Sequence, residues 1–210
     1  MEPTTHWQRW HEPYDDPTSL LSRRLRMVQW YIGEWLDSRA DARLTVLSLC
    51  AGQCHDLLGL LEARADRDRV HAVAVELDPG NVALARDAAA GLPQVQVREA
   101  DAGDPASWAD VSPVDLVLLT GMLGNISDDD VQRTVAALPA LCRGGATVIW
   151  TRTRRLPDLT PAIRAWFTEA GFTELAFDAP ADVLFSVGVH RLDGSRQASP
   201  PSDRLFRFVN

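Results

Sequence analysis

The chain has 210 residues, a formal net charge of −8, 46% hydrophobic residues and 24% charged ones. This length suits one sizeable hydrophobic core and is short for two domains. No hydrophobic run approaches the roughly 20 residues that a membrane span needs, and the first residues lack the basic start and apolar core of a secretory signal. The net acidity, without a basic stripe, disfavours nucleic acid as a partner. We expect a cytoplasmic protein that acts on a small molecule, with neither a membrane nor a nucleic acid as partner.

Two residue types narrow the chemistry further. All 21 basic residues are arginine, and the absence of lysine excludes a Schiff-base lysine and a Walker A lysine. The three cysteines, Cys50, Cys54 and Cys142, cannot all form pairs, and this favours a reducing compartment. Cys50, Cys54 and His55 lie close in sequence, but zinc needs four ligands, or three and a water. Because no second cluster of such residues lies nearby, we interpret them as packing residues at a tight turn and predict no metal site.

Hydrophobic residues at helical spacing predict a helix near the N-terminus. They are Leu21, Leu25, Val28, Ile32 and Leu36. Asp16 and Pro17 would open this helix as its cap and its first residue.

The segment before this helix is rich in aromatic and histidine side chains. They are Trp7, Trp10, His11 and Tyr14. They form either a cap that buries apolar area or a lid that closes over a ligand. We assign residues 1–40 to this cap or lid and residues 41–210 to a single compact domain.

The rest of the chain alternates strands with helices. Strands are predicted at Leu44–Leu49, Val70–Glu76, 94–100, 114–120 and 146–151, then at 173–177 and 184–191. Helices are predicted at 56–65, 79–90, Asp128–Leu141 and 161–170. Gly144 and Gly145 would end the third of these helices, and 204–209 is a candidate for one further strand. The alternation predicts an α/β fold with a doubly wound, mostly parallel seven-stranded sheet, an antiparallel edge hairpin formed by the last two strands, and an N-terminal helical cap.

A candidate ligand-binding turn follows the first strand, in the run "VLSLCAGQCHD" (46–56). A strand that turns on small residues into a helix presents the helix N-terminus to a ligand. Glu76 ends the second strand, where its carboxylate can accept hydrogen bonds from both hydroxyls of a ribose. Of the glycines of the dinucleotide fingerprint only Gly52 is present, so cysteine and alanine side chains would obstruct a diphosphate. The turn therefore favours a nucleoside without phosphate.

These features resemble the class I (Rossmann-like) S-adenosylmethionine-dependent methyltransferases over residues 44–191. The first motif of that family, acidic-x-Gly-x-Gly-x-Gly, is altered here. Its four marked positions hold Ser48, Cys50, Gly52 and Cys54. The runs "AVAVELDPGNVALAR", "VREADAGD" and "VDLVLLTGMLGNI" match the second, third and fourth motifs in order. The first motif is also similar to the "LSLCAGDGRD" of an actinobacterial-type subfamily that acts on small molecules.

The resemblance implies a Rossmann-like domain, S-adenosylmethionine as cofactor and a set of cofactor-binding residues. They are Cys50, Ala51, Gly52, Asp56, Glu76, Leu77, Asp101, Ala102, Thr120 and Gly121. Glu76 would bind the ribose, Leu77 would lie beside the adenine, and Asp101 would accept the adenine amino group. The Ala102 backbone would meet a ring nitrogen, and the strand end at 120–121 would face the methionine part.

Ser48 departs from the family pattern, because it stands where an acid usually fixes the amine of the cofactor. Thr120, Asp56 or an N-terminal residue would have to compensate for the missing acid.

The implied reaction is methyl transfer to a small molecule by in-line displacement, which depends mainly on positioning and on the exclusion of water. His11 and Tyr14 are candidate bases for an acceptor that must lose a proton, and Asn125 is a candidate orienting group. The arginine-rich run 152–155 either meets an anionic substrate or forms a solvated loop.

Two other functions stay open at this stage, as does the choice between monomer and homodimer. The altered first motif is compatible with a regulatory protein that binds adenosylmethionine or adenosylhomocysteine without catalysis. An oxidoreductase that uses NAD is less favoured, because the glycines are missing and a lysine-free chain cannot have a Tyr-x-x-x-Lys pair.

Overall fold

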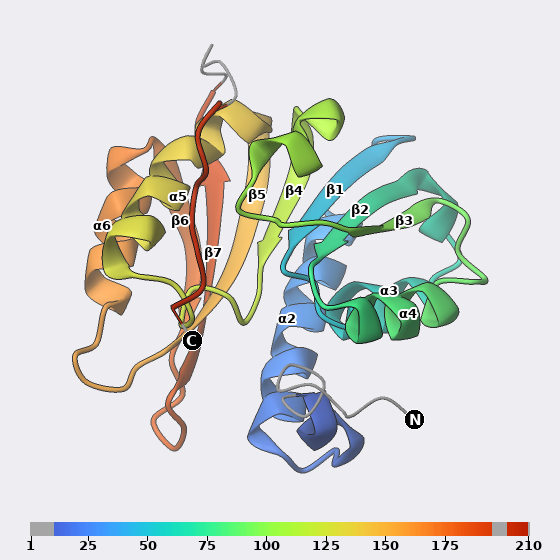
Figure 1. Cartoon of the computed structure of the whole chain (residues 1–210), viewed down its shortest axis with the longest axis horizontal. Coiled ribbons are helices and arrows are strands. Elements are labelled where there is room, and N and C mark those ends of the chain that lie inside the picture. Colours follow the sequence, from blue (N-terminus) through green and yellow to red (C-terminus); the bar gives the residue numbers. More distant parts are fainter. Residues whose placement is uncertain (1–10, 195–200, 210) are drawn as a thin grey trace.

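A seven-stranded sheet in the order β3-β2-β1-β4-β5-β7-β6 forms the centre of the fold. The computed structural model describes residues 11–194 and 201–209 (Figure 1). The strands are β1 (Leu44–Leu49), β2 (Val70–Glu76), β3 (Val95–Glu99), β4 (Val114–Leu119), β5 (Cys142–Thr153), β6 (Phe172–Asp178) and β7 (Phe185–Leu192). Strands β1 to β5 pair in parallel, whereas β7 pairs antiparallel with both β5 and β6. The predicted mostly parallel sheet with an antiparallel edge hairpin is confirmed.

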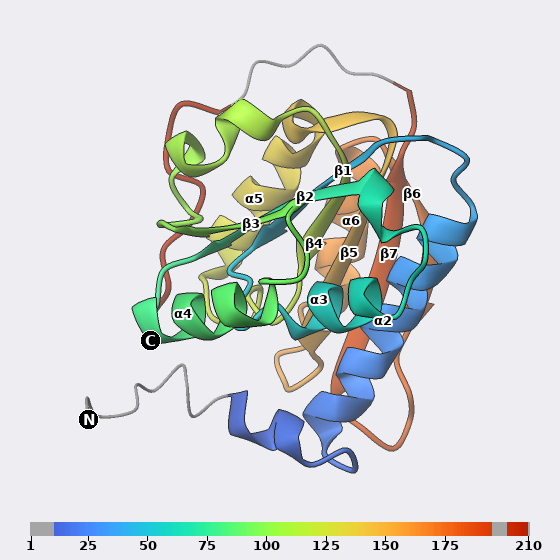
Figure 2. The ribbon, with the colours of Figure 1, turned by 90° about the vertical axis from the view of Figure 1, so that its right-hand side faces the viewer.

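Helices cover both faces of this sheet, as Figures 1 and 2 show. Helices α2 (Leu20–Asp37), α3 (His55–Glu62) and α4 (Pro79–Ala88) lie on one face, and α5 (Asp128–Leu141) and α6 (Thr160–Glu169) lie on the other. Short turns of 3-10 helix are η1 (Glu12–Asp15), η2 (Arg67–Arg69), η3 (Pro105–Ser107) and η4 (Ala109–Val111). Among the described helices, none has the length and apolar character that crossing a membrane requires.

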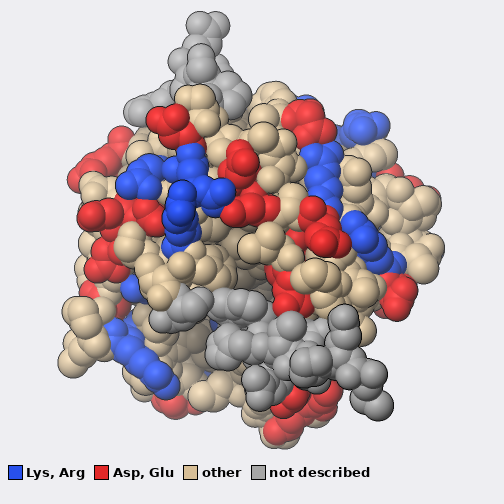
Figure 3. All heavy atoms as spheres, in the orientation of Figure 1, with Lys and Arg blue, Asp and Glu red and all other residues tan. Residues whose placement is uncertain are grey.

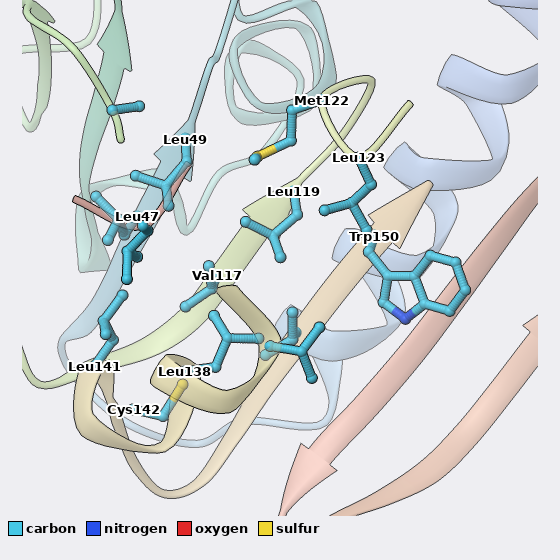
Figure 4. Packing of buried hydrophobic residues seen from close by; sticks show 14 of the residues in the cluster. Leu47, Leu49, Val117, Leu119, Met122, Leu123, Leu138, Leu141, Cys142 and Trp150 are labelled. Atoms are coloured by element: carbon cyan, nitrogen blue, oxygen red, sulfur yellow. The ribbon is translucent and has the colours of Figure 1, made fainter. Parts of the chain in front are cut away.

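The hydrophobic core has two halves, one on each face of the sheet, because successive side chains of a strand point to opposite faces. In β1, Leu47 and Leu49 belong to the half under α5 and α6, whereas Leu44 and Val46 belong to the half under α2, α3 and α4. Figure 4 shows the first half. Its labelled residues are Leu47, Leu49, Val117, Leu119, Met122, Leu123, Leu138, Leu141, Cys142 and Trp150. Burial on both faces of the sheet explains the continuous apolar run from Leu116 to Leu119 in β4.

The start of α2 differs from the prediction. Ser19 caps the helix, since its hydroxyl accepts a hydrogen bond from the backbone N–H of Ser22 at 3.0 Å. Asp16 instead accepts from the backbone N–H of Thr18 at 2.8 Å, in a turn that precedes the helix. The prediction of Asp16 as the cap and Pro17 as the first helical residue is therefore wrong by about one turn.

Two predictions near the end of α5 and at the C-terminus are also wrong. Gly144 and Gly145 do not end the helix, because Cys142 is already extended and begins β5. The glycines lie inside β5 where its register with β4 shifts, and Gly145 has a φ of +80°. Residues 204–209 form no strand beyond a single antiparallel bridge between Ile126 and Phe208.

An aromatic cluster fills the core between β5, β7 and α6. The indole of Trp150 donates a hydrogen bond to Nδ1 of His190 at 3.1 Å, and Phe167 stacks on the imidazole with 4.3 Å between ring centroids. A β-carbon added at Gly188 would overlap the indole, so glycine is required there. Trp150 is fully buried, whereas Trp166 is only partly buried against this half of the core. Burial lowers the pKa of His190 to about 4.

Acid is expected to destabilise the fold through His190. Its pKa falls from an ordinary 6.5 to about 4 in the folded state, so unfolding takes up a proton between these values and the stability present above pH 6.5 is lost as the pH falls toward 4. The linkage amounts to about 1–2 kcal/mol between pH 6.5 and pH 5. Urea unfolding of the wild type and of His190→Asn at both pH values measures it. A pH dependence as steep in the variant as in the wild type would contradict the assignment.

Candidate functional site

A cavity of about 660 Å³ opens at the carboxyl ends of β1, β2 and β4. Strands β1 and β4 are neighbours in the sheet, and the strand order reverses between them, which is where open α/β sheets bind ligands. The cavity is lined by every residue that the sequence predicts as catalytic or cofactor-binding. They are His11, Tyr14, Cys50, Ala51, Gly52, Asp56, Glu76, Leu77, Asp101, Ala102, Thr120, Gly121 and Asn125.

The turn between β1 and α3 has an unusual backbone. Cys50, Gly52 and Cys54 have φ angles of +54°, +56° and +58°, in the left-handed region that favours glycine. These are the three positions at which the family motif has glycine. Non-glycine residues in this region carry strain of about 1–3 kcal/mol each, and such strain gathers at functional sites. The turn therefore has the conformation of a glycine motif, although cysteine stands at two of its positions.

Glu76 joins this turn to the turn that follows β2. Its carboxylate accepts hydrogen bonds from the backbone N–H groups of Gly52 and Asp78, each at 2.8 Å. Burial raises the pKa of Glu76, and the backbone donors oppose that effect. Each carboxylate oxygen has two lone pairs, so both can accept a further hydrogen bond from a ligand.

A hydrogen bond between Asp56 and Thr120 forms another polar contact in the cavity. It joins the start of α3, which follows β1, to the end of β4. The Thr120 hydroxyl donates to Oδ2 of Asp56 at 2.6 Å. Asp56 as a whole residue is 7% exposed, and the Oδ1 of its carboxylate has no hydrogen-bond partner among the described residues. Burial raises the pKa of Asp56, whereas the Thr120 hydroxyl lowers it. Ser48 is fully buried in β1 and does not line the cavity.

The N-terminal side of the cavity is an aromatic cluster. The centroid of the Tyr14 ring lies 5.6 Å from the ring centroid of His11 and 5.0 Å from that of His55. The guanidinium of Arg24 donates a hydrogen bond to the Tyr14 hydroxyl at 2.7 Å. Burial, followed by the charges of His55 and Arg24, lowers the pKa of His11 to about 4. Burial raises the pKa of Tyr14. Both side chains are therefore neutral near pH 7.

Trp7 and Trp10, the other aromatic residues assigned to the cap or lid, lie outside the described residues. The part of the cap that is described takes part in the cavity wall through α2, which contributes Arg24, Leu25 and Val28.

The C-terminal segment also lines the cavity, which the sequence analysis missed. Arg204 donates to Oδ2 of Asp101 in an ion pair, while the backbone N–H of Gly103 donates to Oδ1 at 2.9 Å. Phe206 and Phe208 line the wall beside them (the segment runs alongside α5 in Figure 1). A signal for these contacts was absent from the sequence, because Arg204 and Asp101 lie 103 residues apart and 204–209 lacks the alternation of a half-buried strand.

Asn125 forms hydrogen bonds that connect the loop after β4 internally and to the C-terminal segment. Its side-chain amide donates to the Gly121 carbonyl at 2.9 Å, and its own carbonyl accepts from the Val209 backbone at 2.9 Å. The arginines at 152–155 are not part of the cavity wall. Arg152 donates to the Leu123 carbonyl, and Arg154 donates to the carbonyls of Pro180 and Val183, so both hold their own chain together.

Surface charge on the face drawn in Figure 3 is mixed. Arginine and acidic side chains are interspersed there and do not gather into one broad basic area. In the ranges 11–194 and 201–209, no group of three or more His, Cys, Asp or Glu is arranged to hold a metal ion.

No family model matches the sequence, and a search of curated proteins finds no match either. Solved structures do match. The fold is similar to that of magnesium protoporphyrin IX methyltransferase (ChlM) from Synechocystis PCC 6803 with bound SAM, at 14% identity and a TM-score of 0.67 over 90% of this chain and 92% of that chain. It is also similar to N-methyltransferase NodS from Bradyrhizobium japonicum WM9, at 14% identity and a TM-score of 0.62 over 86% of this chain and 99% of that chain.

A third similar structure is the fibrillarin pre-rRNA processing protein of Methanococcus jannaschii. Its identity is 16% and its TM-score 0.58, over 74% of this chain and 69% of that chain. At these identities the likeness is one of fold. The chain has the Rossmann-like fold of S-adenosylmethionine-dependent methyltransferases, and such a fold does not select the methyl acceptor.

Gly52→Ala is expected to damage the site. A β-carbon there would overlap the imidazole of His11, and the φ of +56° is strained for alanine. We expect a loss of about 1–3 kcal/mol in the free energy of unfolding, measured by urea denaturation. Gly91→Ala is the matched control, because nothing lies within 4 Å of its added β-carbon. Equal stability of the two variants would contradict the strained, closely packed turn.

Proposed function

We propose that this protein transfers the methyl group of S-adenosylmethionine to a small-molecule acceptor. The observation that carries the proposal is the convergence of the left-handed turn at 50–54 and the Glu76 carboxylate on one cavity, at the point where the strand order reverses. Glu76 would bind the ribose hydroxyls. The solved methyltransferases of the same fold support this proposal.

The residues present fit an adenosyl group. Gly52 lacks a β-carbon, which allows the His11 imidazole to pack directly against the turn on the N-terminal side of the cavity. Leu77 is 62% exposed although it lines the cavity, and a hydrophobic side chain left exposed there suits a flat base laid against it. Asp101, which accepts hydrogen bonds from Arg204 and Gly103, would also accept one from an amino group of that base.

When bound, the cofactor supplies a methyl group already activated by its sulfonium. The chain then has to position the acceptor and exclude water. Tyr14 remains protonated, so we assign it an orienting role through its hydroxyl and not the role of a base. His11 is unprotonated near pH 7 and can accept a proton, although a pKa of about 4 makes it a weak base. Asn125 is assigned an orienting role at the end of β4.

A small acceptor is proposed because the cavity is walled by α2 on one side and by the C-terminal segment on the other. Residues 1–40 would act as the lid of a catalytic domain at 41–210, in a cytoplasmic protein of the small-molecule subfamily with an LCAG first motif, as a monomer or homodimer. We propose no nucleic acid and no membrane as partner, and on the one face drawn in Figure 3 basic and acidic side chains are interspersed.

The altered first motif, with Ser48, Cys50 and Cys54 at three of its four marked positions, is compatible with a second candidate function. A protein that binds adenosylmethionine or adenosylhomocysteine and regulates a partner needs no base. Binding of both nucleosides without methyl transfer to any acceptor in a broad screen would favour this alternative.

The test is calorimetric titration of the protein with adenosylmethionine, adenosylhomocysteine and NAD. We expect the wild type to bind the first two and Glu76→Gln to bind them about 10- to 100-fold more weakly, because hydrogen bonds from the ribose to a charged carboxylate are lost. Glu99→Gln, an exposed acid at the end of β3, is the control and should bind as the wild type does. A folded wild type that binds neither nucleoside, or that binds NAD preferentially, would overturn the proposal.

A further inference from the structure

The first residue of α3, His55, lies on the cavity wall and does more than pack the turn that precedes the helix. The centroid of its ring lies 5.0 Å from that of Tyr14 and 5.8 Å from that of His11. The side-chain amide of Gln29, in α2, donates to the His55 carbonyl at 2.9 Å and fixes the backbone at this point. His55 is therefore a third titratable side chain on the N-terminal wall, beside the two that the sequence predicts as candidate bases.

A chain of hydrogen bonds determines which ring nitrogen of His55 carries the proton. The side-chain amide of Gln53 donates to the side-chain oxygen of Asn81 at 3.3 Å. The other end of that amide, the Gln53 carbonyl oxygen, faces Nε2 of His55 at 3.1 Å. Because a carbonyl oxygen can only accept, the network assigns the N–H of the neutral imidazole to Nε2. Nδ1 then keeps its lone pair.

The two ring nitrogens of His55 differ in what surrounds them. Nε2 is bonded to Gln53, which is not part of the cavity wall, whereas the His55 ring is. Nδ1 has no hydrogen-bond partner in the described part of the chain. An imidazole with one nitrogen fixed by a protein partner and the other open is the arrangement in which histidine accepts a proton from a ligand.

The charges around His55 make it a better proton acceptor than His11. Burial lowers the pKa of His55, and the neighbouring acids Asp56 and Asp15 oppose that effect. These acids would stabilise the imidazolium that forms when His55 takes up a proton. Burial, His55 and Arg24 together lower the pKa of His11 to about 4. Of the two histidines in the cluster, His55 is thus the one with acids that favour its protonated form most.

An aromatic hydroxyl is the acceptor group that suits this base. Its pKa of about 10 is far closer to that of an imidazole than the pKa of an aliphatic alcohol is. The rings of His55, Tyr14 and His11 also give the wall an aromatic surface against which a flat substrate can pack.

We propose that His55 is a catalytic residue whose Nδ1 accepts the proton of an aromatic hydroxyl on the methyl acceptor. This inference rests on the proposed function. As the hydroxyl oxygen forms its bond to the methyl carbon, the carbon–sulfur bond breaks and its electron pair stays on sulfur, which gives neutral adenosylhomocysteine. The hydroxyl proton moves to Nδ1 and passes to water after the products leave.

The tautomer is measured first, by nitrogen NMR of the protein with isotope-labelled histidine, and His55→Asn assigns the signals. We expect neutral His55 to carry its proton on Nε2 in the wild type. Gln53→Met should lose this preference, because it removes the carbonyl oxygen that accepts from Nε2. A wild type with the proton on Nδ1 would overturn the inference whatever the acceptor is.

Catalysis is measured as methyl transfer from S-adenosylmethionine to phenol and to a nitrophenol, which ionises without the help of a base. We expect His55→Asn to lower kcat for phenol at neutral pH by at least about 100-fold. The loss should shrink for the nitrophenol and as the pH rises, because the acceptor is then already ionised. His71→Asn changes a histidine of β2 outside the cavity wall and should act as the wild type does.

Three results of the transfer assay would overturn the inference and leave the cofactor site of the proposed function intact. They are a wild-type kcat in His55→Asn, an equal loss for both phenols at every pH, and a wild type that binds S-adenosylmethionine but methylates neither phenol. A folded wild type that does not bind S-adenosylmethionine would instead overturn the proposed function itself.

Discussion

The Glu76 carboxylate is the contact on which the site depends. By accepting the backbone N–H groups of Gly52 and Asp78, it fixes the turn after β1 relative to the turn after β2. Parallel strands bring their carboxyl ends to one edge of a sheet, but they do not hold the loops there in a defined arrangement. A buried carboxylate between two backbone donors supplies that arrangement and still faces the cavity with free lone pairs.

The same region carries features that lower stability. Cys50 and Cys54 adopt left-handed backbone angles, and Asp56 has a buried oxygen without a donor among the described residues. Such strained or unpaired groups persist where the surrounding structure fixes their conformation. Here the sheet, with one half of the hydrophobic core packed on each face, provides that support. Their concentration in one short stretch, residues 50–56 at the carboxyl end of β1, is what a binding site built on a rigid scaffold requires.

The regular elements were accessible from the sequence because their signals are local. The predicted bounds of β1, β2 and α5 agree with the structure, since each is a hydrophobic pattern between turn residues or caps. The prediction that the glycines at 144–145 end helix α5 was wrong, because the helix ends before it reaches them. Here the chain is already extended at Cys142, and the glycines serve a shift of register in β5.

The order of the motifs and the alternation of strands with helices along the chain were enough to predict the α/β sheet and the acids at the ends of its strands, because both are read from patterns within single segments. The pairings that shape the cavity depend on contacts between distant segments. Thr120 meets Asp56 across 64 residues, and Arg204 meets Asp101 across 103. Periodicity carries no information about such distances, and a C-terminal segment without alternation could not be assigned to the cavity wall. Folding alone brings these side chains together, because the packing of the sheet and its helices decides which loop ends become neighbours.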